Sequence, residues 1–285
     1  MNSTIDSSHV IPGALYGAPK SVPKYPSGFS LRALITPNQL AVLISENKSK
    51  KIFQLQPFQF TENISKSEWM KEIDSLLRTE WFFKQEWSVK KITIFLPAFT
   101  LVPAQFYSLD LSETLISWNI TKDQNDEVLY DGIEGTDIRL IYTIPKQLLF
   151  QLPPEAEIQH TLTVLLRYLL QSRDSLKSLN IYVYIQQSSF QLIYIKDRSL
   201  KFCNSFNYKS PYDFIYYLLF ACKQLDLDPK NLSVTLMGEI MRESYLFQLL
   251  HTYVRNVEFA PMPSGWQFDT EYPLPGHFFY NLFCI

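Results

Sequence analysis

The sequence predicts a bilobal α/β protein in which each lobe is built on the same βββαβ order of elements. Two observations support this prediction. The order of two hairpin strands, a third strand, an amphipathic helix and a buried strand occurs twice along the 285 residues. The three strands before the helix also stand at one offset of 150 residues, since Leu31 matches Ile181 and Lys51 matches Lys201. The offset falls to 143 at the helix starts, from Ser67 to Ser210. The copies share order and spacing without sequence identity, and an internal duplication is the simplest explanation.

The first copy begins at Phe29. Leu31–Ile35 and Leu40–Ile44 are short apolar runs separated by a turn that contains proline and asparagine, and this pattern predicts a β-hairpin. Lys51–Phe60 is predicted as a third strand, because apolar and polar residues alternate near its end.

The helix of the first copy has a clear N-terminal signal. Ser65 and Glu68 form a capping-box pattern, in which each side chain satisfies a main-chain N–H group at the helix start. Apolar residues then recur at helical spacing, at Trp69, Ile73, Leu76, Leu77 and Trp81. Lys91–Pro97 follows, and its continuous apolar run predicts a buried strand.

The second copy repeats this order. Its four strands are predicted at Ile181–Ile185, Phe190–Ile195, Leu200–Phe206 and Leu232–Leu236. The helix before the last strand opens with Ser210 as N-cap, Pro211 at the first helical position and Asp213 three residues after the cap.

Between the copies the pattern is weaker. A short helix, a strand and a longer helix are predicted at Leu115–Trp118, Arg139–Ile144 and Gln159–Leu170. Residues 121–137 are rich in carboxylates and are predicted to form a solvated acidic loop. A calcium-binding EF-hand is excluded there, because Val128 stands where that loop needs glycine.

Four segments follow from this pattern. Residues 1–28, rich in Ser, Pro and Gly, are predicted to be a disordered tail. Residues 29–175 form the first subdomain and residues 176–260 the second. Residues 261–285 combine prolines with many aromatic side chains, and we expect them to pack on the body of the protein, with partner binding as the alternative.

Bulk properties exclude several classes of protein. The net charge is −2 and no basic stripe is present, which argues against nucleic-acid binding. The three cysteines fit neither a disulfide framework nor a metal knuckle. No signal peptide and no apolar run of about 18 residues is found, so we expect a soluble, cytoplasmic protein without a membrane span.

Four short motifs resemble those of one uncharacterised Bacteroidetes family, a domain of unknown function assigned an actin-like ATPase fold. They are FTLVP at Phe99–Pro103, NSFNY at Asn204–Tyr208, SPYDFIYYLL at Ser210–Leu219 and MGE at Met237–Glu239. The resemblance extends over the chain from Phe29 onward. It implies an actin-like (ribonuclease H-like) fold, in which two subdomains face each other across a nucleotide cleft.

The resemblance also indicates where a nucleotide would bind. Working actin-like ATPases hold phosphates in the turns of both hairpins, where glycine allows close approach and a carboxylate orients Mg²⁺. The first turn, residues 36–39, contains neither a glycine nor a carboxylate, and Pro37 lacks an N–H group. The second turn, residues 186–189, also lacks both, and the loop after the last strand has a single glycine, Gly238.

These absences predict that the chain has no catalytic residues, no metal site and no cofactor. The four histidines are scattered without zinc-like spacing. The leading hypothesis is therefore a non-catalytic scaffold or adaptor that binds an unknown protein partner, with homo-oligomer formation left open. The alternative is a nucleotide-binding ATPase or sensor with a degenerate cleft. Its contacts would come from Thr36, Asn38, Ser188, Ser189 and Gly238.

Overall fold

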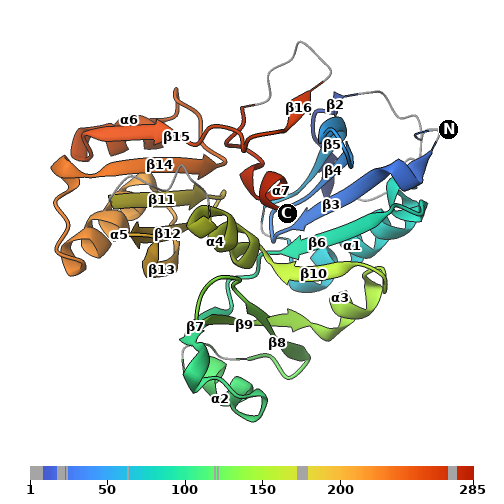
Figure 1. Cartoon of the computed structure of the whole chain (residues 1–285), viewed down its shortest axis with the longest axis horizontal. Helices are drawn as coiled ribbons and strands as arrows, with labels where there is room; N and C mark the ends of the chain where they lie inside the picture. Colours follow the sequence, from blue (N-terminus) through green and yellow to red (C-terminus); the bar gives the residue numbers. More distant parts are fainter. Residues whose placement is uncertain are drawn as a thin grey trace. The chain divides into compact units, whose positions relative to one another are not determined.

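The chain divides into two compact units. The computed structural model describes all residues except 1–8, 18–22, 24, 63, 119, 121, 172–178 and 269–274. Unit 1 comprises residues 1–167, 265–273 and 285, and unit 2 comprises residues 168–264 and 274–284. Each unit is built around one mixed β-sheet with helices packed on it (Figure 1).

The sheet of unit 1 has a core of five strands in the order β5-β4-β3-β6-β10. β3, β4 and β5 form the predicted antiparallel meander, and β6 and β10 continue the sheet parallel to β3. The five strands are β3 (Phe29–Ile35), β4 (Gln39–Glu46), β5 (Lys51–Phe60), β6 (Val89–Ile94) and β10 (Glu157–His160). The four predicted strands of the first copy are thus confirmed.

Helix α1 (Lys66–Thr79) covers one face of this sheet, followed by the 3-10 turn η2 (Trp81–Lys84). Its start is the predicted capping box: the Glu68 N–H donates to Ser65 Oγ (3.2 Å), and the Ser65 N–H donates to the Glu68 carboxylate (3.1 Å). The apolar face is buried against the sheet through Trp69, Ile73, Leu76 and Leu77. The helical period therefore predicted the buried face correctly.

The expectation of a disordered tail over residues 1–28 is wrong for part of that segment. Strands β1 (Val10–Pro12) and β2 (Tyr16–Gly17) pair antiparallel with β5, and β16 (Gln267–Phe268) pairs with its start. A 3-10 turn, η1 (Pro26–Gly28), leads into the sheet. The physical reason is that β5 would otherwise present an unpaired edge of N–H and C=O groups. Residues 1–8, 18–22 and 24 of the predicted tail lie outside the described residues.

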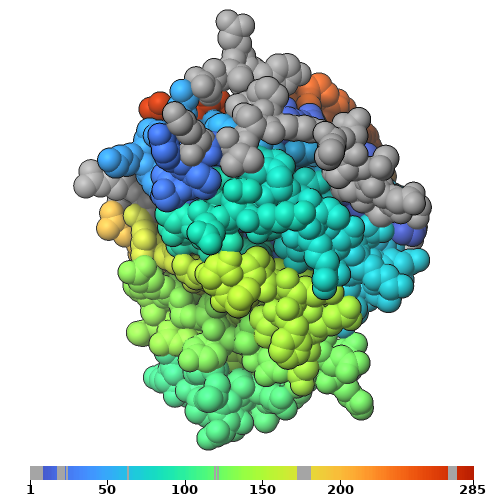
Figure 2. All heavy atoms as spheres, turned by 90° about the vertical axis from the view of Figure 1, so that its right-hand side faces the viewer, coloured from blue at the N-terminus to red at the C-terminus, as the bar shows by residue number. Residues whose placement is uncertain are grey.

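A second layer of structure is inserted between β6 and β10. This insert, residues 99–151, contains the three-stranded antiparallel sheet β7-β9-β8 and two helices. Its elements are β7 (Phe99–Pro103), η3 (Ala104–Phe106), η4 (Leu109–Leu111), α2 (Ser112–Ser117), β8 (Asp126–Gly132), β9 (Ile138–Pro145) and α3 (Lys146–Gln151). Leu115, Ile116 and Ile141 form a small core inside it. Figure 2 shows the surface of the insert on one face of unit 1, in green, with its last part in yellow-green.

One prediction for this region is wrong, and one helix begins two residues later than predicted. The acidic segment 121–137 is not one solvated loop, because Asp126–Gly132 forms strand β8 in register with β9. The helix predicted at Gln159–Leu170 begins later, since α4 spans Thr161–Gln171 and the preceding residues belong to β10. The polar residues of β8 hid its strand character, and a four-residue strand followed directly by a helix gives no periodic signal.

Buried polar groups join β8, β10 and α4. One Asp131 carboxylate oxygen accepts the His160 N–H and the Thr163 hydroxyl, both at 2.7 Å. The fully buried His160 ring contacts the Leu96 carbonyl oxygen through Nε2 (3.2 Å), and its Nδ1 accepts the Leu162 N–H. Burial lowers the pKa of His160 to about 4, so the ring is neutral and structural.

Unit 2 repeats the sheet of unit 1, in the order β13-β12-β11-β14-β15. Its strands are β11 (Leu179–Ile185), β12 (Ser189–Lys196), β13 (Ser199–Asn207), β14 (Ser233–Gly238) and β15 (Asn256–Phe259). The helices are α5 (Pro211–Gln224), α6 (Tyr245–Tyr253) and α7 (Tyr280–Cys284), with a 3-10 turn η6 (Pro229–Asn231). The predicted cap of α5, Ser210 with Pro211 and Asp213, is confirmed.

The five core strands of unit 1 correspond in order and direction to the five strands of unit 2. In each, a three-stranded antiparallel meander is followed by a helix and then by two strands parallel to the first. This correspondence supports the internal duplication that order and spacing predicted.

Candidate functional site

The first hairpin turn, residues 36–38 between β3 and β4, satisfies its own main-chain donors. The buried Thr36 hydroxyl oxygen accepts the N–H groups of Asn38 (3.2 Å) and Gln39 (3.0 Å). The Thr36 carbonyl in turn accepts Trp69 Nε1–H from helix α1 at 3.0 Å. A phosphate bound at this turn would need those same N–H groups, and the threonine hydroxyl already holds them.

The second hairpin turn, between β11 and β12, is closed in a similar way. Ser189 Oγ contacts the Gln186 side-chain oxygen at 3.1 Å, and the Tyr208 hydroxyl donates to the Gln186 carbonyl at 2.7 Å. Ser188 is exposed, and its carbonyl accepts the Tyr208 N–H. The Gln187 N–H, at the tip of the turn, donates to the carboxylate of Glu239. The Glu239 carboxylate therefore occupies the N–H donor that this turn could otherwise offer to a bound anion.

Gly238 holds the end of β14 against β11. Its φ is +90°, and a Cβ at this position would lie 2.1 Å from the Ile185 carbonyl oxygen. Its N–H donates to the His277 carbonyl oxygen at 2.6 Å, and the next N–H, of Glu239, donates to Ile185. The close strand approach accounts for the glycine, and its donor is used inside the unit.

Burial raises the pKa of Glu239 to about 7, although the hydrogen bond from Gln187 opposes this shift. The structure thus brings Ser188, Ser189 and Gly238 together at one end of the sheet of unit 2, and Thr36 and Asn38 together in unit 1. Sequence reasoning missed Glu239 as the group that fills the second turn. The MGE motif contained the signal, a carboxylate immediately after a buried strand.

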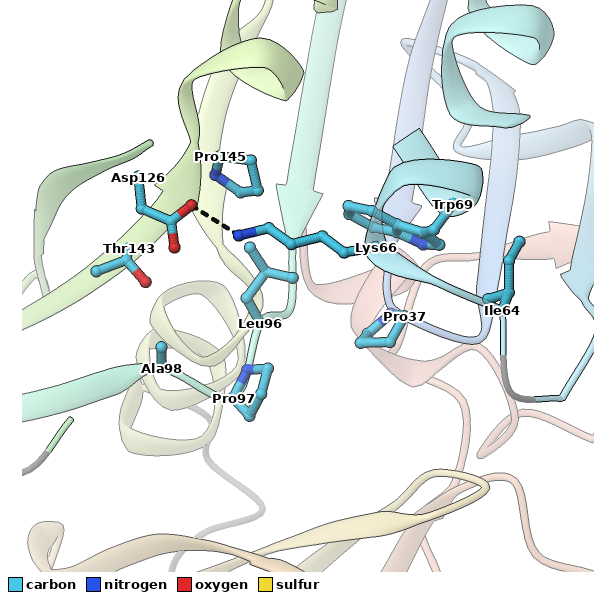
Figure 3. A pocket seen from close by; sticks show the side chains of 10 residues that line it. All are labelled: Pro37, Ile64, Lys66, Trp69, Leu96, Pro97, Ala98, Asp126, Thr143 and Pro145. Carbon is cyan, nitrogen blue, oxygen red and sulfur yellow. Dashed lines mark hydrogen bonds and ion pairs between the residues drawn. The ribbon is translucent and has the colours of Figure 1, made fainter. Parts of the chain in front are cut away.

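A cavity of about 360 Å³ lies beside the first turn, within unit 1 (Figure 3). Its walls come from the turn, the start of α1, the segment after β6, and strands β8 and β9. Apolar residues form most of the lining: Pro37, Ile64, Trp69, Leu96, Pro97, Ala98 and Pro145. The volume lies in the range of small-molecule and side-chain pockets, and the three prolines present no N–H donor.

Lys66, which is paired with two aspartates, borders this cavity. Lys66 Nζ lies 3.0 Å from Asp126 and 3.1 Å from Asp123. Burial alone would lower the pKa of Lys66, but the hydrogen bonds and charges of the two aspartates outweigh it and raise the pKa. The lysine charge is therefore matched by two carboxylates, and the cavity offers no excess positive charge to a phosphate.

Thr143 adds a polar group to the apolar wall. Thr143 is 3% exposed and lines the cavity. Figure 3 shows it next to Asp126, on the same side of the cavity. The site therefore combines an apolar space with polar groups from Lys66, Asp126 and Thr143, which can both donate and accept hydrogen bonds. Sequence analysis missed Lys66, Asp126 and Thr143, because the contact requires β8 to be a strand.

The described residues contain neither a cluster of metal ligands nor a membrane-spanning helix. No three His, Cys, Asp or Glu side chains come together as a metal site would require. No described helix is long and apolar enough to span a membrane.

The chain is similar in structure and sequence to proteins of one fold. A family model described as "Protein of unknown function (DUF3822)" matches residues 27–257. A *Bacteroides thetaiotaomicron* protein with an actin-like ATPase fold and unknown function has a TM-score of 0.75 and 19% identity, covering 84% of this chain and 94% of that one. The PilM-PilN type IV pilus biogenesis complex gives a TM-score of 0.52 and 12% identity, with 87% and 91% covered. No curated protein sequence is detectably similar to the chain. The predicted actin-like ATPase fold is thus confirmed.

Proposed function

The chain belongs to the DUF3822 family and has an actin-like ATPase fold, and we propose that it is a non-catalytic scaffold or adaptor that acts by binding another protein. We propose that the protein acts in the cytoplasm. None of Cys203, Cys222 and Cys284, all of which the structure describes, is in a disulfide, which is consistent with a reducing compartment.

One observation supports the proposal above all: the hairpin turns that hold phosphates in working actin-like ATPases use their donors internally. The Thr36 hydroxyl takes two N–H groups of the first turn, and the Glu239 carboxylate takes the Gln187 N–H of the second. A phosphate at either turn would have to displace a satisfied hydrogen bond, and at the second turn it would also meet a carboxylate.

The fold itself is compatible with protein binding. PilM, which shares it, was solved in a complex with PilN. This likeness establishes the fold alone, and the support for an adaptor role comes from the occupied turns and from the mostly apolar lining of the cavity beside the first turn.

A titration with Mg-ATP tests the non-catalytic half of the proposal. We expect the Tm of the full chain to stay unchanged up to millimolar Mg-ATP, while an active actin-like ATPase measured in parallel shows a rise. A site filled at a hundred times its Kd would add about 2.7 kcal/mol of stability. A saturable rise in Tm would contradict the proposal.

The protein-binding half is tested by purification of the tagged full chain from its native host. We expect one protein to co-purify at a constant ratio through two further columns. A chain that elutes as a clean monomer without a partner would contradict an adaptor role.

A further inference from the structure

The insert of unit 1 exposes a group of large apolar side chains around helix α2. Among the described residues, fifteen large apolar side chains are exposed, and six of them belong to the insert, although the insert spans only residues 99–151. Four of the six stand in η3, in η4 and at the two ends of α2. They are Phe106 (61% exposed), Leu109 (70%), Leu111 (48%) and Trp118 (73%), and we call them the tip patch.

The local structure of α2 holds the tip patch outward. One face of the helix is buried in the small core of the insert, against β7, β8 and β9. Leu111 and Trp118 cap the two ends of α2 and are seven residues apart, which is two helical turns, so they lie along one side of it. The Ser112 hydroxyl donates to the Leu109 carbonyl at 2.7 Å and fixes η4 against the helix start. Figure 1 shows α2 on the side of the insert sheet away from the five-stranded sheet of unit 1.

Such a group of side chains differs from the scattered apolar residues of an ordinary surface. A single exposed leucine is common in soluble proteins, whereas several large apolar side chains on neighbouring turns mark a contact surface. Tryptophan contributes most among interface residues when a partner covers it, and Trp118 is the most exposed member of the patch. The tip patch is therefore suited to being covered by the apolar side of a partner.

The charge of the insert indicates which partner. Residues 99–151 contain eight carboxylates and three basic side chains, a net charge of −5, whereas the net charge of the whole chain is −2. Lys66 of α1, which pairs with two of these carboxylates, reduces the value to −4. Asp110, between Leu109 and Leu111, is exposed. The other exposed carboxylates of the insert are Glu113, which pairs with Lys122 at 2.6 Å, and Asp123, Glu134 and Asp137. Such a surface attracts a cationic partner.

The same charge disfavours two other occupants of the tip patch. A symmetric contact between the patches of two copies of this chain would bring their negative charges together. A membrane surface rich in anionic lipid would repel the insert in the same way.

We propose that the tip patch binds a basic amphipathic segment of the partner protein. Apolar side chains of that segment cover Trp118 and its neighbours, and its lysine or arginine side chains lie against Asp110 and the surrounding carboxylates. This inference rests on the proposed adaptor function, because it assigns the surface through which the partner is held.

The probe for a test is a phage-displayed library of random peptides, selected on the full chain. We expect the enriched peptides to combine Lys or Arg with several apolar residues. The Kd of one such peptide is then measured by fluorescence polarisation with the wild type and two variants. Trp118→Ala removes the largest side chain of the patch and should weaken binding at least about tenfold. Asp110→Lys reverses one charge and should weaken binding more at low salt than at physiological salt.

Phe150→Ala and Glu86→Lys are the matched controls. Phe150 is an exposed aromatic residue of the same insert, in α3, which packs against α1, and Glu86 is an exposed carboxylate of unit 1 outside the insert. Both variants should leave Kd unchanged. Leu109→Ala is a second patch variant at a highly exposed position, and it keeps the test valid if circular dichroism shows that Trp118→Ala is misfolded.

Several results would overturn the inference. They are the absence of enrichment, the enrichment of acidic or uncharged peptides, and binding that the variants of Trp118, Leu109 and Asp110 leave unchanged. Binding of the chain to phosphatidylcholine vesicles that Trp118→Ala abolishes would assign the patch to a membrane. Self-association that Trp118→Ala abolishes in size-exclusion chromatography would assign it to a second copy.

The two proposals fail in different ways. A co-purifying partner that still binds Trp118→Ala and Asp110→Lys would refute the role of the tip patch and leave the adaptor role intact. Patch-dependent binding of basic peptides by a chain that co-purifies with no partner would refute the adaptor role and leave the binding preference of the patch intact.

Discussion

At the residue scale, Glu239 is the side chain with the largest consequence for the second turn. It accepts the Gln187 N–H while burial disfavours its charged form and raises its pKa to about 7. Near neutral pH its charge is therefore sensitive to small changes. Tyr184 and Tyr208, which lie close enough to influence it electrostatically, stay neutral in this range.

Replacing Glu239 should change how stability depends on pH. Because the folded-state pKa is raised from the usual 4.5, the native state binds the proton more tightly, and this contribution is lost as pH rises from about 4.5 through about 7. Glu239→Gln removes it. In urea unfolding, we expect the variant to gain stability relative to the wild type between pH 5 and pH 8. Glu243→Gln, at an exposed carboxylate, is the control. An equal difference at both pH values would show that Glu239 does not titrate in this window.

At the element scale, patterns among neighbouring residues predicted the two long helices, whereas strands that depend on pairing with other segments were not predicted. The capping boxes at Ser65 and Ser210 fixed both long helices because every group involved lies within four residues. Strand β8 could not be predicted, since its polar residues make sense only when β9 pairs with them and Lys66 meets Asp126. Strands β1 and β2 were not predicted for the same reason, because their partner β5 lies some forty residues away along the chain. The candidate cavity depends on β8 and was missed with it.

The capping boxes allow a direct comparison between the two units. Ser65→Ala leaves the Glu68 N–H without its hydroxyl acceptor, and Ser210→Ala does the same to the Asp213 N–H. Each change should cost about 1 kcal/mol in chemical denaturation. Ser67→Ala, at an exposed position inside the first turn of α1, should have little effect. If Ser67→Ala destabilised the chain as much as Ser65→Ala, the cap would not be the cause.

At the scale of the whole molecule, each of the two units contains a hydrophobic core of its own. One surrounds Ile73 and Trp69 in unit 1, and the other surrounds Leu218 and Phe214 in unit 2. Each of these cores is formed between one sheet and helices of the same unit.

Cavity-forming substitutions should therefore act locally. Ile73→Ala and Leu218→Ala each remove a fully buried aliphatic side chain and should each cost about 2–5 kcal/mol. In hydrogen exchange, we expect Ile73→Ala to lower protection in the strands β3 to β6 and Leu218→Ala to lower it in β11 to β14. Uniform loss of protection across the chain with either variant would show that the two cores unfold as one.

The insert has a consequence for how proteins of this family can diversify. Its three-stranded sheet leaves and rejoins unit 1 at neighbouring points, since the Thr143 N–H donates to the Ala98 carbonyl and Phe99 pairs with Tyr142. The long excursion between them has its own small core, and lengthening such a loop costs little entropy. Mutations, insertions or deletions there would reshape one wall of the cavity beside the first turn, while the five-stranded sheets keep their packing.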